Sequence, residues 1–217
     1  MLIEQGFELV QRVVGDSWTE AARKKLFRPG EAGTRCLLDE PAVRKIVGSV
    51  RAALAVAGRL PTTAVAIQAI AFDKTPDANW KVAWHQDLMF PFARRVQSEG
   101  YTLPSRKEEV DYARPPRSVL ESLLAVRIHL DDCNEASGPL RVAPGSHRQG
   151  IIRGADVAEI VARQGQTTCL AKSGDALLMK PLLLHASSPA SAPQRRRVLH
   201  LVYHAGAAIP EPWHRAI

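Results

Sequence analysis

A chain of 217 residues, 46% of them hydrophobic, can bury the core of one ordinary domain. Because no segment repeats, we expect a single domain spanning residues 1–217. There is no basic segment leading into an apolar run and no stretch of about 18 apolar residues, so we expect neither secretion nor a membrane span and place the protein in the cytoplasm. Its 3 cysteines are too widely spaced for a zinc cluster or a disulfide framework.

The net charge of +7 is concentrated in the C-terminal third. Residues 1–140 hold 19 Lys and Arg against 18 Asp and Glu, whereas residues 141–217 hold 10 against 4. A basic surface can bind nucleic acid, but the interleaving of basic and aromatic residues that stacks bases is absent, so we do not expect nucleic acid as a partner. The remaining interpretations are solubility and a basic pocket rim that steers an anionic small molecule.

Residues 1–62 are predicted to form a helical N-terminal support. The segment 3–26 favours a helix. A second helix begins at Asp39-Glu40-Pro41, because an acidic start and a first-turn proline are typical of a helix N-terminus, and it ends at Gly58. The apolar residues of this second helix recur at helical spacing and define one buried face: Val43, Ile46, Val47, Val50 and Leu54.

From residue 63 to residue 204 the sequence changes to short β-rich runs, most of them separated by turn signals. Many short strands with Gly and Pro between them indicate an antiparallel sandwich or barrel. The fold class is therefore mainly β with flanking α-helices. The predicted strands cover residues 64–72, 82–85, 123–130, 140–142, 167–171, 176–179, 182–186 and 198–203.

Between the two groups of strands, residues 88–117 are polar and irregular. A long loop in a compact domain is usually functional or disordered. Because this one directly follows the motif described next, we interpret residues 88–117 as a candidate lid that selects the substrate; the alternative is a mobile surface loop.

His85-Gln86-Asp87 is the motif that carries the chemistry. Residues two apart on a strand point to the same side, so His85 and Asp87 can bind one ion while Gln86 points away. His185 lies 98 residues after Asp87 and can supply a third ligand. Two histidines and one carboxylate on one face of Fe(II) leave positions open for a co-substrate and O2, which is typical of non-haem iron oxygenases.

The motif alone is weak. With 7 His and 10 Asp in the chain, chance gives roughly 0.3 such triplets. A second copy, His129-Leu130-Asp131, could equally present both side chains on one strand face. At most one of the two pairs is expected to bind the metal.

Context separates the two copies. The stretch from Asp77 to Asp87, together with Gly138-Pro139-Leu140 and Pro144-Gly145-Ser146-His147, resembles the phytanoyl-CoA dioxygenase family. The similarity covers most of residues 64–204. It implies a double-stranded β-helix (jelly roll, cupin-like) and an Fe(II)- and 2-oxoglutarate-dependent dioxygenase that uses O2 and releases succinate and CO2.

Carried over position by position, the resemblance implies that His85, Asp87 and His185 bind Fe(II), with no catalytic side chain beyond the metal centre. It implies that Arg196, 11 residues after His185, binds the distal carboxylate of 2-oxoglutarate, a task that suits a planar and permanently charged guanidinium. Ser187 matches a hydroxyl that some relatives use on the same co-substrate.

Strand alternation refines these assignments. Arg195 and Arg197 should lie on the face opposite Arg196, towards solvent. Arg127 and His129 should form a polar strand face inside the barrel, and Arg127 is a candidate for binding an anionic substrate or co-substrate; the alternative is a salt bridge between Arg127 and Asp131. His200 and His204 alternate on the last strand and receive no role.

Family variation also bears on the reaction. Halogenating relatives replace the carboxylate of the motif by a small residue, but Asp87 is present here, so the resemblance points to hydroxylation of a small organic substrate. The substrate and the oligomeric state stay open. The rival functions are a metal-binding jelly-roll protein that is non-catalytic or independent of 2-oxoglutarate, and a nucleic-acid demethylase with the same iron chemistry.

Overall fold

Two antiparallel β-sheets dominate the computed structural model, which describes residues 1–28, 31–192 and 195–217. The larger sheet runs in the order β1 (Phe7–Val10), β11 (Ala176–Met179), β8 (Leu123–His129), β13 (Arg196–His204), β3 (Val65–Lys74) and β2 (Gly33–Thr34). The smaller sheet runs in the order β10 (Thr167–Cys169), β9 (Leu140–Val142), β12 (His185–Ser187) and β4 (Val82–His85). The predicted antiparallel, mainly β architecture is confirmed.

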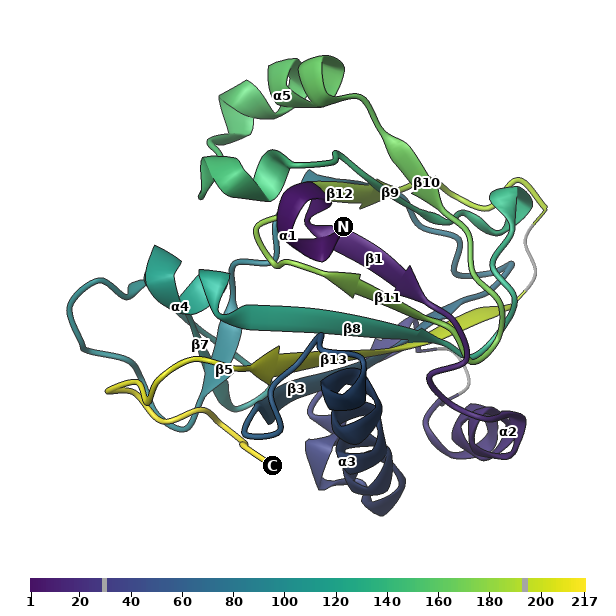
Figure 1. Cartoon of the computed structure of the whole chain (residues 1–217), viewed down its shortest axis with the longest axis horizontal. Helices are drawn as coiled ribbons and strands as arrows, with labels where there is room; N and C mark the ends of the chain where they lie inside the picture. The colour runs from purple at the N-terminus through teal and green to yellow at the C-terminus, as the bar shows by residue number, and fades with distance from the viewer. Residues whose placement is uncertain (29–30, 193–194) are drawn as a thin grey trace.

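Alternation along the central strands builds a layer on each face of the larger sheet. On β8, Val126 and Ile128 point outward into a cluster with the helices, whereas Leu123 and Ala125 point inward into a second cluster that also holds residues of the smaller sheet. Figure 1 shows the result, with α3 on the outer side of the larger sheet and the strands β9, β10 and β12 on its other side. The space between the two sheets is the inside of the fold.

The helices are short except for α3 (Pro41–Val56), which begins at the predicted proline and buries the five predicted apolar residues against the larger sheet. The hydroxyl of Tyr203 on β13 donates a hydrogen bond to the carbonyl of Val47 (2.9 Å) and fixes the helix to that sheet. The other α-helices are α1 (Leu2–Gln5), α2 (Asp16–Lys25), α4 (Arg117–Glu121) and α5 (Val157–Gln164). Single 3-10 turns cover Leu37–Asp39, Glu135–Ser137, Ser146–Gln149 and Gly154–Asp156.

The prediction of one helix over residues 3–26 is wrong in its middle. Gly6, with φ 83°, ends α1 after one turn, and the chain continues as β1, which pairs with β11 at the edge of the larger sheet. This pairing joins Phe7 to Met179, a partner that no local pattern contains. Long-range strand pairing therefore overrides helix propensity here.

Residues 88–117 are not irregular. They hold a three-stranded sheet in the order β5 (Phe90–Phe92), β7 (Val110–Arg114) and β6 (Thr102–Lys107). Every residue of β6 except Ser105 is exposed, so this strand lacks the apolar alternation that identifies strands from sequence. In the described part of the chain, no helix is long and apolar enough to cross a membrane.

Candidate metal centre and its cavity

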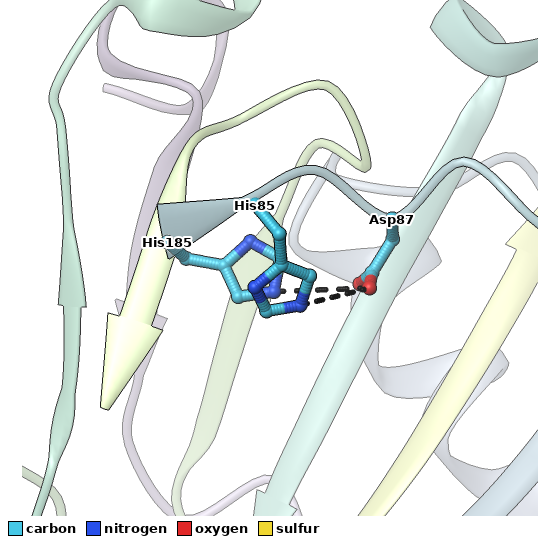
Figure 2. Close-up of side chains that lie close together, drawn as sticks. All are labelled: His85, Asp87 and His185. Atoms are coloured by element: carbon cyan, nitrogen blue, oxygen red, sulfur yellow. Dashed lines mark ion pairs between the residues drawn. The ribbon is translucent and has the colours of Figure 1, made fainter. Parts of the chain in front are cut away.

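The three predicted ligands meet between β4 and β12, and Figure 2 shows their side chains converging. His85 ends β4 and His185 begins β12, and the two residues are cross-strand partners in the smaller sheet. Asp87 Oδ1 lies 3.7 Å from His85 Nε2 and 3.7 Å from His185 Nε2. Because metal–ligand bonds to such atoms are about 2.0–2.2 Å long, one ion can reach all three groups.

Both imidazole rings are held in the same way. The Nδ1 of His85 hydrogen-bonds the carbonyl of Ala83 (2.9 Å), and the Nδ1 of His185 hydrogen-bonds the carbonyl of Leu183 (2.9 Å). A carbonyl can only accept, so each Nδ1 carries the proton and each Nε2 keeps its lone pair for a metal. The donor set therefore fits a divalent transition metal.

Gln86 points away from the ligands, as predicted, and fastens their surroundings. Its amide nitrogen donates to the carbonyls of Gly150 (2.8 Å) and Leu182 (2.6 Å), and its amide oxygen accepts from the N–H of Ile152 (2.8 Å). The N–H of Asp87 donates to the carbonyl of Pro181 (2.9 Å). The segment that precedes His185 is thus tied to the motif that carries the other two ligands.

The electrostatic environment keeps the ligands in their metal-binding protonation states. Burial opposes ionisation of Asp87, but His185, His200, His85 and Arg127 together lower its pKa below the ordinary value. Burial lowers the pKa of His185 to about 4. At neutral pH the carboxylate is therefore charged and the buried imidazole is neutral, as metal binding requires.

The second copy of the motif does not bring its histidine and aspartate together. His129 points into the fold, where neither ring nitrogen has a hydrogen-bond partner among the described residues. Asp131 lies beyond the end of β8 and pairs with Arg197 (Nη2–Oδ1 2.7 Å) and Arg23 (Nε–Oδ1 3.1 Å). The strand ends before Asp131, so the same-face rule fails for this pair.

Of the three consecutive arginines at 195–197, Arg196 is the one that lines the cavity. Arg196 is 5% exposed and lines the cavity next to the ligands. Arg195 pairs instead with Asp73 (Nη2–Oδ2 2.6 Å), and Arg197 pairs with Asp131. Burial lowers the pKa of Arg196, and the nearby Cys133 thiol offsets part of this decrease. No carboxylate pairs with Arg196 within the described ranges, whereas both neighbours have one.

The prediction that Arg195 and Arg197 face solvent is only partly right. The side chain of Arg195 is 45% exposed, but that of Arg197 is 15% exposed because it packs against Asp131 and lies over the ring of Phe27. The alternation itself, with Arg196 inward and its neighbours outward, is as predicted.

A cavity of about 260 Å³ extends from the ligands between the sheets. Its walls are aromatic and apolar, and its charged lining is mostly basic. The aromatic and apolar lining includes Phe72, Trp80, Val82, Met89, Phe90, Tyr112 and Leu140; the basic side chains are Arg35, Lys107, Arg127 and Arg196, and Asp87 is the acidic one. Ser187, buried and two residues after His185, also lines the cavity.

Arg127 lies inside the fold and does not form the salt bridge with Asp131 that the sequence left open. Its Nη1 lies 3.4 Å from His200 Nδ1, its guanidinium lies over the ring of Phe72 (5.5 Å to the centroid), and its Nε has no partner among the described residues. Burial, and secondarily the nearby Arg196, lowers its pKa to about 10. Arg127 is therefore a buried cation that faces the cavity without a salt-bridge partner among the described residues.

Sequence reasoning missed some of the cavity. His200 had no assigned role but is buried, lines the cavity and contacts Arg127. Its position on the same strand face as Arg196, four residues away, was the available signal. Trp80 and Phe72 also line the cavity, but aromatic residues in strands usually pack in cores, so no sequence pattern distinguishes them from core residues.

This fold brings two histidines and one aspartate, a ligand set that could hold one metal ion, together beside a cavity between antiparallel β-sheets. The sequence model of the family described as Phytanoyl-CoA dioxygenase (PhyH) matches residues 4–198. The chain belongs to that family, as the motifs predicted. No curated protein matches the sequence.

Solved structures share the fold at low sequence identity. AviO1 from Streptomyces viridochromogenes Tue57 is 20% identical, with a TM-score of 0.67 over 97% of this chain and 95% of AviO1. HygX from Streptomyces hygroscopicus, solved with nickel and 2-oxoglutarate, is 16% identical, with a TM-score of 0.62 over 94% of this chain and 84% of HygX. SnoK, a non-heme alpha ketoglutarate dependent carbocyclase from nogalamycin biosynthesis, is 16% identical, with a TM-score of 0.64 over 94% and 81%.

Proposed function

We propose that this protein is an Fe(II)- and 2-oxoglutarate-dependent dioxygenase that hydroxylates a small organic substrate. One observation carries the proposal: the His85, Asp87 and His185 ligand set opens into the same cavity as Arg196, a buried arginine without a carboxylate partner among the described residues. A buried, unpaired guanidinium destabilises a fold unless a ligand supplies the anion. The distal carboxylate of 2-oxoglutarate is such an anion.

The residues present fit both groups. His85 and His185 present Nε2 to the metal position, since Nδ1 of each bonds a carbonyl, and Asp87 offers a charged oxygen; this set suits Fe(II) and leaves coordination positions open. We assign Arg196 and the Ser187 hydroxyl to the distal carboxylate of 2-oxoglutarate. Arg127, the second buried cation of the cavity, is assigned to an anionic substrate or co-substrate as a further electrostatic contact.

When bound, the iron supplies O2 activation coupled to oxidative decarboxylation of 2-oxoglutarate to succinate and CO2. The protein positions the co-substrate, provides the charges that bind it and keeps water away from the reacting atoms. Arg196 and Ser187 orient the co-substrate towards the ligands, and the apolar walls exclude water from the reacting atoms. Asp87 occupies the position that a halide would need, which argues against halogenation.

Hydroxylation is the outcome we propose for the substrate, although SnoK shows that a protein of this fold can be a carbocyclase. We also propose the jelly-roll description, supported by a chain that crosses repeatedly between the two sheets, and a single domain over residues 1–217. The β5–β7 sheet is proposed as the lid, because Phe90, Lys107 and Tyr112 from it line the cavity.

The decisive experiment measures succinate formed from 2-oxoglutarate by protein loaded with Fe(II) without oxygen and then exposed to O2, with a panel of small substrates. Wild type is expected to turn over, and His85→Ala and Arg196→Ala are expected to abolish turnover. Asp131→Asn is the matched control, because it changes the aspartate of the other motif copy and should leave metal binding intact. Wild-type protein that binds neither metal nor 2-oxoglutarate would instead indicate a non-catalytic protein.

A further inference from the structure

The register of β13 gives the cavity two ends. Arg196 pairs with Lys74 of β3, and His200 pairs with Ile70 of the same strand. Arg196 and His200 are four residues apart along the strand, which corresponds to roughly 13 Å. A co-substrate anchored at Arg196 and directed to the metal ligands therefore leaves the His200 end of the cavity free for the substrate.

His200 presents a hydrogen-bond donor at that end. Its ring is 4% exposed and lines the cavity, with its Nδ1 3.4 Å from Arg127 Nη1. A guanidinium can only donate, so Nδ1 accepts and a neutral ring carries its proton on Nε2. Among the described residues, no protein group forms a hydrogen bond with Nε2. Nε2 is also not fully enclosed by protein atoms. The Nε2–H group is therefore available to a ligand in the cavity.

The charges around this end of the cavity favour an oxygen acceptor. Among the described residues neither Arg127 nor Lys107, both of which line the cavity, forms a salt bridge, and the acid that acts on Arg127 is Asp87. Arg35 is also basic, although it shares its charge with Glu108 (Nη1–Oε1 3.4 Å). The acid that lines the cavity, Asp87, belongs to the metal centre. The charged side chains that line the cavity are therefore basic apart from Asp87, which disfavours a cationic ligand.

We propose that His200 binds the substrate through Nε2–H, and that the substrate is a small carboxylate whose apolar part packs against Phe72, the ring beside His200 (centroids 6.1 Å apart). Arg127 holds the imidazole in the tautomer that donates. This inference rests on the proposed function, since it assumes that 2-oxoglutarate occupies the Arg196 end. It makes His200 a specificity-determining residue of the cavity.

The test uses the wild-type protein with Fe(II) and 2-oxoglutarate under anaerobic conditions, titrated calorimetrically with benzoate and with benzylamine. These probes share a ring and differ in the sign of their charge. Benzoate is expected to bind and benzylamine is not. His200→Phe should weaken benzoate binding by about tenfold or more, the effect of losing a hydrogen bond to a charged group, while 2-oxoglutarate affinity stays within about twofold.

Two further variants separate a specific role from a structural one. His200→Gln keeps an acceptor for Arg127 and a donor for the cavity, so it should retain most of the benzoate affinity. His204→Phe is the matched control: His204 lies on the same strand face but contacts Trp213 (Nε1–Nδ1 3.3 Å) outside the cavity lining. It should not change benzoate binding.

Each outcome decides the matter. Equal binding of benzoate and benzylamine, or benzoate binding that survives in His200→Phe, overturns the inference while the proposed function stands. Loss of 2-oxoglutarate binding in His200→Phe also overturns it, because His200 is then a co-substrate residue. If the wild-type protein binds neither Fe(II) nor 2-oxoglutarate, the proposed function itself has failed.

Discussion

Replacing Arg196 by methionine should separate ligand binding from folding. Methionine keeps the length and apolar volume of the arginine stem but removes the charge. In the ligand-free protein Arg196 is 5% exposed and its Nε has no partner among the described residues. In the proposed complex with 2-oxoglutarate, the same guanidinium would become half of a buried ion pair.

The magnitudes follow from these two states. Truncating one partner of a buried charge pair costs about 2–5 kcal/mol, so 2-oxoglutarate should bind Arg196→Met roughly 30-fold to several thousandfold more weakly. Removing an unpartnered buried polar group relieves about 1–3 kcal/mol, so the free energy of unfolding of the ligand-free variant should be unchanged or higher.

Arg195→Met provides the opposite pattern. Arg195 makes three contacts of 2.6–3.1 Å with Asp73, whose side chain is 3% exposed. Replacing Arg195 leaves the buried Asp73 carboxylate without this partner and should lower the free energy of unfolding by about 1–3 kcal/mol. The affinity for 2-oxoglutarate should change little. The assays are anaerobic calorimetry with 2-oxoglutarate and denaturant unfolding. An Arg196→Met protein that is destabilised like Arg195→Met but binds 2-oxoglutarate normally would refute the reasoning.

Other parts of the site yield further predictions. Gln86→Leu removes three hydrogen bonds and should lower the unfolding free energy by about 1–3 kcal/mol and accelerate metal loss to a chelator; unchanged metal release would contradict its tethering role. Burial lowers the pKa of His129 to about 3. As the pH falls below 6.5, the unfolded chain binds a proton at this histidine, whereas the folded chain does not bind it until the pH approaches 3. The free energy of unfolding should therefore decrease as the pH falls from 6.5 towards 3. His129→Leu should flatten that part of the stability curve measured by denaturant titration. Replacing residues 102–114 by a short linker should broaden substrate selection while 2-oxoglutarate is still consumed without substrate; unaltered selectivity in the succinate assay would exclude a lid.

Local pattern was sufficient for the parts of the molecule that are built locally. The strands β4, β9 and β11 have the predicted bounds, and the buried face of α3 is the predicted one. Strand alternation also placed Arg127 and Arg196 inside the fold. In each case the residue's neighbours along the chain determine which side of the element is buried.

The errors arise where a distant segment decides the outcome. β1 is a strand because β11 pairs with it, and β6 because β7 does. Asp131 cannot act as Asp87 does, because Arg23, from a helix more than a hundred residues earlier, and Arg197 draw it outward. A role for His200 depends on its contact with Arg127, which lies on another strand. None of these partners lies within the window that a periodic pattern covers.

The buried cations Lys74 and Arg196 should lower the stability of the ligand-free fold, and the same two charges indicate that the ligand is an anion. Lys74 is 1% exposed and is the strand partner of Arg196, and burial together with that arginine lowers its pKa to about 8. Two buried cations opposite one another destabilise a sheet. Apolar residues would fit this position better unless an anion is bound nearby.

A dianionic ligand at Arg196 should therefore gain from Lys74 while Lys74 is charged. Because the pKa of Lys74 in the folded protein is depressed from 10.5 to about 8, the lysine is protonated below pH 8 and loses its proton as the pH rises through that value. The affinity for 2-oxoglutarate, measured calorimetrically with redox-inert nickel at the metal site, should fall between pH 7 and pH 9. In Lys74→Met the affinity should be lower at pH 7 and should lose most of this pH dependence. An equal decline in both proteins would show that the field of Lys74 does not reach the co-substrate, and would leave its burial explained only by its bond to the Ser188 carbonyl (2.8 Å) and its position over the Trp80 ring.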